Sequence, residues 1–146
     1  MKFILFLSVI ITLMKSQAQS IPEVVIQSLE KIKMPQDSVT WKRRFSLYVA
    51  KIISKDSAEK YISMSEEGVV VCEELKVTAE NLPNNLLNYV FANFPTLGIN
   101  EAFIIKHNLN PCIKYKVLVR KAEVYFDRNG NFMDSVSAHE EFNEKM

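Results

Sequence analysis

Two amphipathic segments, each opened by a proline, constrain the fold of this chain more than any other feature of its sequence. Pro22 and Pro83 lie 61 positions apart, and proline suits the first turn of a helix because its missing N–H has no intrahelical partner there. Apolar residues then recur at helical intervals: Val25, Leu29 and Ile32 in the first segment, and Leu86, Val90 and Phe94 in the second. Pro35 and Pro95 end the two patterns, so we expect two short helices, each with one apolar face.

After each segment the hydrophobic period changes from that of a helix to that of a β-strand. The strand-like ranges are 45–53, 61–64 and 69–72 after the first segment, and 113–120 and 122–126 after the second. Gly68 and Gly130 stand 62 positions apart in corresponding turns, and Asn129-Gly130 is a strong hairpin signal.

We therefore predict an α+β fold of two tandem units, each a helix followed by an antiparallel meander of about three strands, with both helices packed on one face of the sheet. The predicted divisions are 1–18 as a signal peptide, 19–80 as the first unit, 81–136 as the second unit, and 137–146 as a charged C-terminal tail. Besides the two helix faces, the predicted core contains Val117, Val119, Val124 and Phe126.

The first eighteen residues have the pattern of a secretory signal. Lys2 supplies a positive charge, residues 3–14 are mostly apolar, and residues 16–18 place small side chains at the −3 and −1 positions of a cleavage site. The apolar run is too short to span a bilayer. We expect cleavage before Gln19, no stable membrane anchor afterwards, and a periplasmic or secreted location.

The composition argues against several function classes. The chain has 18 Lys and Arg against 17 Asp and Glu, a formal net charge of +1, which does not favour binding to nucleic acid. Only three glycines are present, and no phosphate-binding glycine motif occurs. Asp127, Asn129 and Asn131 imitate half of a calcium loop, but Ala138 stands where the essential glutamate belongs. We expect no nucleic acid, cofactor or metal.

Catalytic motifs are also missing from the sequence. His107 and His139 are the only histidines, and neither lies in a nucleophile elbow, an HExxH box or an SxxK box. Catalytic groups assemble in space rather than in sequence. A small exported hydrolase that combines dispersed residues, such as His107 and a serine, therefore remains the alternative function.

Cys72 and Cys112 are the only cysteines. In an oxidising compartment they could form a disulfide. They could equally be two strand cysteines that never meet, since each lies beside β-branched residues. Without a CxxC spacing, a zinc site or a thioredoxin-type motif is not expected.

The alternation in residues 113–120 separates two faces of a strand. Ile113, Tyr115, Val117 and Val119 lie on one face, and Lys114, Lys116, Leu118 and Arg120 lie on the other. The second set is a candidate partner-binding surface, to which Trp41 and Tyr48 could add aromatic contact area. The alternative without a binding role is that these residues form the solvated side of a half-buried sheet, where alternation alone requires polar residues.

The chain also resembles a known family. The resemblance rests on Pro22, the helical pattern that ends at Pro35, the tripeptide 39–41 (VTW), and the final hairpin 124–132 (VYFDRNGNF). In these features the chain is similar to the PepSY-like family of exported bacterial proteins, in its β-lactamase-inhibitor-like branch. The turn 65–68 (SEEG), where the family has an Asp-x-x-Gly form, is a departure, as are both cysteines and the tail.

The resemblance implies a non-catalytic protein of the cell envelope that binds an exported protein or peptide. The resemblance implies inhibition or modulation of a peptidase or a β-lactamase as one possible result of such binding. The shared motifs are short and structural, so they transmit the fold more reliably than the activity.

Overall fold

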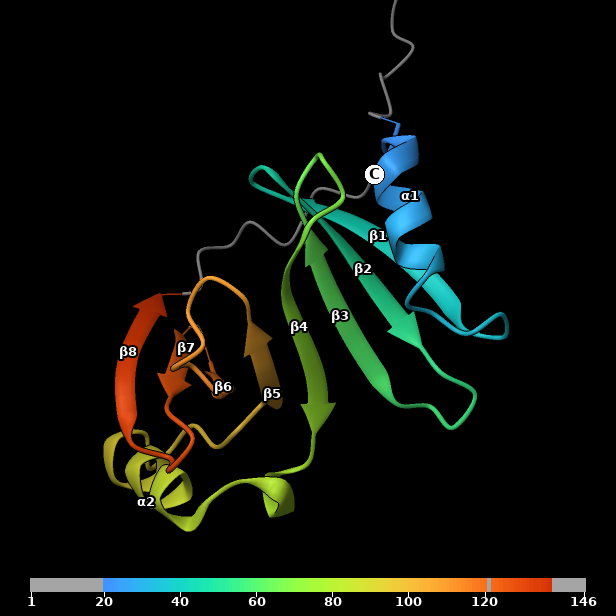
Figure 1. Cartoon of the computed structure of the whole chain (residues 1–146). Coiled ribbons are helices and arrows are strands. Elements are labelled where there is room, and N and C mark those ends of the chain that lie inside the picture. The colour runs from blue at the N-terminus through green and yellow to red at the C-terminus, as the bar shows by residue number, and fades with distance from the viewer. Residues whose placement is uncertain (1–19, 121, 138–146) are drawn as a thin grey trace, which may run out of the picture.

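Eight strands form one antiparallel sheet whose spatial order follows the chain from β1 to β8 (Figure 1). The structure is a computed structural model that describes residues 20–120 and 122–137. The strands are β1 (Ser38–Arg44), β2 (Leu47–Ile53), β3 (Glu59–Met64), β4 (Val70–Val77), β5 (Glu101–His107), β6 (Tyr115–Val119), β7 (Ala122–Phe126) and β8 (Phe132–Ser137). The helices are α1 (Glu23–Glu30) before β1, and the short η2 (Ala79–Asn81) and α2 (Asn84–Asn93) between β4 and β5. The predicted signal peptide and the tail from residue 138 lie outside the described residues.

This architecture corrects the predicted α+β fold of two tandem units. The chain is mostly β, a single eight-stranded sheet accompanied by two short α-helices of 8 and 10 residues. Periodicity missed β1, β5 and β8. The predicted strand at 45–53 begins too early, because Phe45 and Ser46 form the two-residue turn between β1 and β2. Phe45 takes a left-handed conformation with φ of 55°, so a tight turn exists without the glycine or asparagine that usually marks one.

The two helices pack on the same face of the sheet and cover different strands. Val25 and Leu29 of α1 are buried against β2 and β3, in a cluster with Ala50 and Ile62. The second cluster joins α2 to β5, β6 and β7, and its buried members are Leu82, Leu86, Val90, Ala102, Val117, Val119, Val124 and Phe126. We call this side of the sheet the helix-covered face.

Two members of the predicted core differ from expectation. Ile32 follows the end of α1 and is 39% exposed, because the helix stops at Glu30 rather than continuing toward Pro35. Phe94 is the C-terminal cap of α2 and is half-buried against its cluster. The other predicted core residues are buried.

The two turn glycines fix how the helices meet the sheet. Gly68 and Gly130 have φ of 77° and 78°, a conformation that glycine adopts without steric cost. A Cβ on Gly68 would lie 2.8 Å from the carbonyl oxygen of Val24 in α1. A Cβ on Gly130 would lie 3.0 Å from the backbone nitrogen of Leu86 in α2. Each turn is therefore docked closely against one helix.

Candidate functional site

The side of the sheet that faces away from both helices is the candidate site, and we call it the open face. Its side chains alternate along each strand with those of the helix-covered face. Cross-strand partners such as Tyr61 and Glu74, or Phe103 and Lys116, share this side. Its central residues are Lys51 on β2, Glu59 and Tyr61 on β3, Cys72, Glu74 and Lys76 on β4, Glu101, Phe103 and Ile105 on β5, Lys116 and Leu118 on β6, and Glu123 and Tyr125 on β7.

A small apolar cluster lies at the centre of the open face. Cys72, Phe103 and Ile105 are buried there, although both helices pack on the other side. The rings of Tyr61 and Phe103 meet edge to face, with centroids 5.7 Å apart. Tyr61, Ile113, Leu118 and Tyr125 are the partly buried residues packed against the cluster.

The sheet curves around this cluster. Arg44 at the end of β1 reaches Glu123 on β7, with Nη2 and Oε1 3.2 Å apart, although these strands are six places apart in the sheet. Strand twist accumulates across a sheet and turns its two ends relative to each other. The open face is therefore concave, which explains how its centre is buried without a covering helix.

Two charged side chains are buried in this concavity. Lys116 is 5% exposed and Glu123 is 3% exposed. The Lys116 ammonium group donates to the carboxylate of Glu74 and lies 4.6 Å from the centroid of the Phe103 ring. The Tyr125 hydroxyl donates to Glu123. Each buried charge thus has a partner within the protein, as the low polarity of such a site requires.

The ionisation of Glu123 reflects these contacts. Burial alone would raise its pKa, but the hydrogen bond from Tyr125 and the charges of Lys116 and Arg44 together outweigh burial. The pKa of Glu123 therefore lies below its ordinary value. Burial, and then the hydrogen bond to Glu123, raises the pKa of Tyr125. Glu123 is ionised and Tyr125 is neutral at neutral pH.

A more exposed row of alternating charges crosses the same face. The Lys51 ammonium group lies 3.0 Å from the Glu59 carboxylate. Lys76 lies between two carboxylates, at 3.7 Å from Glu59 and 2.7 Å from Glu101. Because these side chains are a quarter or more exposed, their ion pairs can exchange partners with an approaching protein at little cost.

The structure divides the predicted partner-binding residues between the two faces. Lys116 and Leu118 lie on the open face, Lys116 buried and Leu118 half-buried. Lys114 is exposed just before β6, and Arg120 is exposed in the turn after it, with φ of 54°. These two residues flank β6 in the sequence.

Trp41 and Tyr48 belong to the helix-covered face. Both contribute to the cluster under α1, where Tyr48 is only 2% exposed. The Arg43 guanidinium group lies 5.1 Å from the centroid of the Tyr48 ring. Their aromatic surface is used in packing rather than displayed on the open face.

Sequence reasoning missed the acidic half of the site. Glu74 and Glu123 form the ion pairs of the concavity, and Arg44 closes it from β1. The alternation in 122–126 places Glu123 and Tyr125 on one face of the strand and Val124 on the other. The sequence therefore did contain a pattern from which the acidic residue of this face could have been found. No pattern in the sequence indicates that β1 and β7 meet.

Neither the two cysteines nor His107 is placed as a catalytic group. Cys72 is buried on the open face, Cys112 is exposed between β5 and β6, and both thiols are free. Burial, and then the charge of Glu74, raises the pKa of Cys72 to about 12, so it is not a ready nucleophile. His107 uses Nδ1 to accept hydrogen bonds from the N–H groups of Leu109 and Asn110. His139 lies outside the described residues.

The turn that imitates half of a calcium loop is held by its own backbone. Asp127 Oδ1 accepts hydrogen bonds from the N–H groups of Asn129 and Asn131, at 2.8 and 2.9 Å. Within residues 20–120 and 122–137, no group of three or more His, Cys, Asp or Glu side chains is placed to hold a metal ion. These polar residues therefore serve the hairpin turn.

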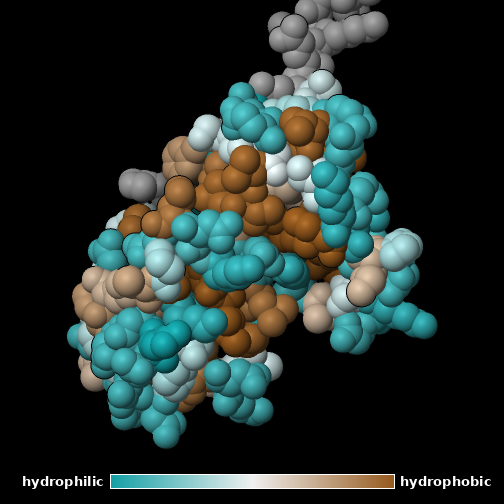
Figure 2. All heavy atoms as spheres, viewed as in Figure 1, coloured by the Kyte–Doolittle hydropathy of each residue, from teal (hydrophilic) through white to brown (hydrophobic). Residues whose placement is uncertain are grey.

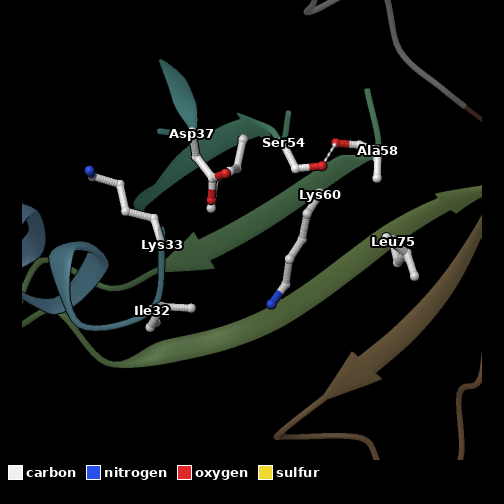
Figure 3. A pocket seen from close by; sticks show the side chains of 8 residues that line it. Ile32, Lys33, Asp37, Ser54, Ala58, Lys60 and Leu75 are labelled. Atoms are coloured by element: carbon white, nitrogen blue, oxygen red, sulfur yellow. Dashed lines mark hydrogen bonds between the residues drawn. The ribbon is translucent and has the colours of Figure 1, made fainter. Parts of the chain in front are cut away.

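A shallow pocket of about 220 Å³ lies beyond the end of α1 (Figure 3). Ile32, Lys60 and Leu75 are among its lining residues. Lys60 forms an ion pair with Glu73 at 2.6 Å, and Lys33 forms one with Glu30 at 3.2 Å. Figure 2 shows hydrophobic side chains gathered over the central strands between hydrophilic margins. Leu75, which lines the pocket, is 41% exposed. Both lysines of the pocket form ion pairs, and Ser54, which also lines the pocket, donates a hydrogen bond to the carbonyl oxygen of Ala58 at 3.2 Å.

Solved structures with the same fold come from Bacteroides species. A protein of Bacteroides eggerthii, provisionally described as periplasmic, matches at a TM-score of 0.67 with 16% identity, over 81% of this chain and 89% of that one. A DUF2874 family protein from Bacteroides uniformis matches at 0.66 with 16% identity, over 84% and 93%. A BLIP-like protein from Bacteroides fragilis matches at 0.61 with 16% identity, over 89% and 96%.

These comparisons define a fold rather than an activity. No family model matches the chain, and no curated protein matches it, so the PepSY-like resemblance is not confirmed. The BLIP-like neighbour does agree with the β-lactamase-inhibitor-like part of that resemblance. The description of the Bacteroides eggerthii neighbour agrees with the predicted periplasmic or secreted location. No helix in the described part of the chain is long and apolar enough to cross a membrane.

Proposed function

We propose that this protein is a non-catalytic, exported binding protein whose open face contacts another exported protein or a peptide. The observation that carries this proposal is the character of the open face. It is concave, both helices pack on the other side, and its charges alternate around an aromatic centre.

The chemistry of the face suits contact rather than catalysis. Buried charges such as Lys116 and Glu123 are held by fixed partners, so the central surface is preorganised. Tyr61 and Tyr125 offer half-buried aromatic rings, a residue type that often anchors protein interfaces. Alternating charges at the margin favour a partner with a complementary pattern, since charge complementarity contributes to specificity.

The fold neighbours support the same class of function. One is described as BLIP-like, and another is described provisionally as periplasmic. An exported enzyme is accordingly one candidate partner, and inhibition or modulation of a peptidase or a β-lactamase is one candidate outcome.

Affinity capture from an envelope extract, followed by titration of the captured and purified protein, tests the proposal. We expect saturable binding that weakens as salt rises, because charged margins contribute to the contact. His107→Ala should leave this binding unchanged. Binding that never saturates, or a turnover by the purified protein that His107→Ala abolishes, would contradict the proposal and favour the hydrolase.

A further inference from the structure

One ion pair spans the open face from β1 to β7. Arg44 is the last residue of β1, Glu123 lies on β7, and their Nη2 and Oε1 atoms are 3.2 Å apart. In the order of the sheet, β2, β3, β4, β5 and β6 lie between these two strands. The pair therefore joins two distant parts of one sheet over the side chains of the strands between them.

The apolar cluster of the open face lies beneath this ion pair. Antiparallel order brings the end of β1 and the start of β4 to the same end of the sheet, so Arg44 and Cys72 lie toward that end. Glu123 is the cross-strand partner of Leu118 on β6. Phe103, on β5, lies between Cys72 on β4 and Leu118 on β6. The ion pair thus runs diagonally across the cluster.

The cluster is buried more deeply than its place in the fold would suggest. Cys72, Phe103 and Ile105 are 7%, 3% and 2% exposed, although both helices pack on the other side of the sheet. Curvature of the sheet provides this burial, and strand twist allows more than one degree of curvature. The contact between Arg44 and Glu123 holds the two ends of the curved sheet together.

This contact is firm at one end and loose at the other. The Glu123 side chain is 4% exposed, and its second carboxylate oxygen accepts a hydrogen bond from the Tyr125 hydroxyl. The Arg44 side chain is 47% exposed and extends from an edge strand. Phe45, the next residue, is 76% exposed in the turn after β1, so the end of β1 has little packing to hold it. An ion pair with one exposed member contributes little to stability and can open while the sheet stays folded.

We propose that the Arg44–Glu123 pair is a clasp, which holds the end of β1 over the apolar centre of the open face and gives access to that centre when it opens. Opening exposes Cys72, while the pair between Lys116 and Glu74 keeps the floor of the concavity in place. The clasp is a property of the free chain.

A role for the clasp in binding rests on the proposed function. A partner that approaches the open face gains the apolar centre as contact area once the clasp opens. A basic side chain of that partner can then pair with Glu123 in place of Arg44, since the buried carboxylate favours a positive charge.

Reaction of the Cys72 thiol with a maleimide reports the opening, because a buried thiol reacts only when it becomes accessible. Cys112→Ser leaves Cys72 as the only thiol of the chain. In that background, at fixed pH, Arg44→Ala should speed the labelling of Cys72 by about fivefold or more. Lys51→Ala is the matched control, because it breaks an ion pair of the same face between the neighbouring strands β2 and β3, where Lys51 lies 3.0 Å from Glu59. It should change the labelling rate by less than about twofold.

Glu123→Gln tests the same contact from its other end. Glutamine keeps an acceptor for the Tyr125 hydroxyl and loses the charge that attracts Arg44, so labelling of Cys72 should again be faster. Arg44→Ala combined with Glu123→Gln should label no faster than Arg44→Ala alone, because both substitutions remove one shared interaction.

The dependence of labelling on urea separates release of the clasp from unfolding. Release exposes little surface, so the labelling rate of Arg44→Ala should hardly change with urea below the unfolding transition. The proposal is overturned if Arg44→Ala labels Cys72 no faster than the wild type, if Lys51→Ala speeds labelling equally, or if the faster labelling follows global unfolding. Release of the clasp in a protein that shows no saturable binding to an envelope protein would contradict the proposed function and not the clasp.

Discussion

The two faces of this sheet solve the problem of burial by different means. On the helix-covered face, α1 and α2 bring aliphatic side chains such as Val25 and Leu86 onto valines and isoleucines of the strands. On the open face, curvature of the sheet alone buries Phe103 and Ile105, together with the charges of Lys116 and Glu123. One face holds two helix-covered apolar clusters, and the other is a concave surface that surrounds an apolar centre with charges.

The difference has an energetic meaning. Burial of apolar surface stabilises by roughly 25 cal/mol per Å², so the helix-covered face should dominate stability. A buried ion pair gains little net stability, because desolvation offsets most of the attraction between its charges. The Lys116–Glu74 and Arg44–Glu123 pairs are therefore better explained by the shape and specificity of the open face than by stability.

The largest effect should come from the helix-covered core. Phe126 is fully buried beside α2, and its ring meets the Tyr89 ring at 5.6 Å between centroids. Phe126→Ala should lower the free energy of unfolding by about 3–5 kcal/mol in chemical denaturation. Phe91→Ala, on the exposed side of α2, is the control and should change it by no more than about 0.5 kcal/mol. Equal losses would mean that α2 does not pack as described.

A pair of glycines isolates the contact between a turn and α2. Gly130→Ala and Gly98→Ala both place a side chain at positive φ, which costs about 1–2 kcal/mol at either position. Only Gly130 has neighbours that a Cβ would meet, at 3.0 Å, whereas none lies within 4 Å of a Cβ on Gly98. Thermal or chemical unfolding should show an additional loss of about 1–3 kcal/mol for Gly130→Ala. Equal stability losses in the two variants would contradict the close packing of the Gly130 turn against α2.

On the open face, one broken ion pair should cost more than the loss of the whole pair. Lys116→Ala leaves the Glu74 carboxylate without its partner at the edge of the apolar cluster, which should cost about 1–3 kcal/mol in unfolding measurements. Lys116→Met combined with Glu74→Met should recover most of that loss. If the double variant is no better than the single one, the pair contributes directly to stability.

The smallest expected effect is on the stability of the protein at acidic pH. The folded-state pKa of Glu123 is lowered, so its contribution to stability is present above the unfolded-state pKa, about 4.3. The contribution is lost as pH falls through the lowered folded value. Denaturation at a series of acidic pH values should show a weaker decline for Glu123→Gln than for the wild type. Parallel pH profiles would show that Glu123 does not contribute.

Where strong patterns exist, the sequence predicted the structure well. The spacing of Val25 and Leu29, and of Leu86 and Val90, located both helices and their buried faces. Gly68 and Gly130 located two turns, because left-handed backbone beside a packed helix requires glycine. Such local requirements leave a signal in the chain.

Two of the three missed strands, β1 and β8, are edge strands, which lack neighbours on one side and so do not need regular apolar alternation. The turn at Phe45 and Ser46 contains no usual turn residue. Each helix is followed by four strands instead of the predicted three, and all eight strands belong to one sheet.

The site was harder to predict than the fold. Alternation placed Lys116 and Leu118 on one side of β6, and the structure agrees. Whether a residue such as Lys116 is exposed depends on the curvature of the whole sheet, which brings Arg44 to Glu123 across five intervening strands. Long-range curvature is a property of the assembled sheet, so no local pattern reports it.

Binding of the captured envelope protein to two matched charge variants tests the central claim most directly. Lys114 and Arg120 are exposed immediately before and after β6, whose Lys116 and Leu118 lie on the open face, and Lys31 and Lys55 are exposed elsewhere. Lys114→Glu with Arg120→Glu should raise the dissociation constant at least about tenfold, a change of about 1.4 kcal/mol, and should reduce its dependence on salt. Lys31→Glu with Lys55→Glu should leave the dissociation constant unchanged. Equal affinity of both variants, or a loss confined to the Lys31 and Lys55 variant, would contradict the assignment of binding to the open face.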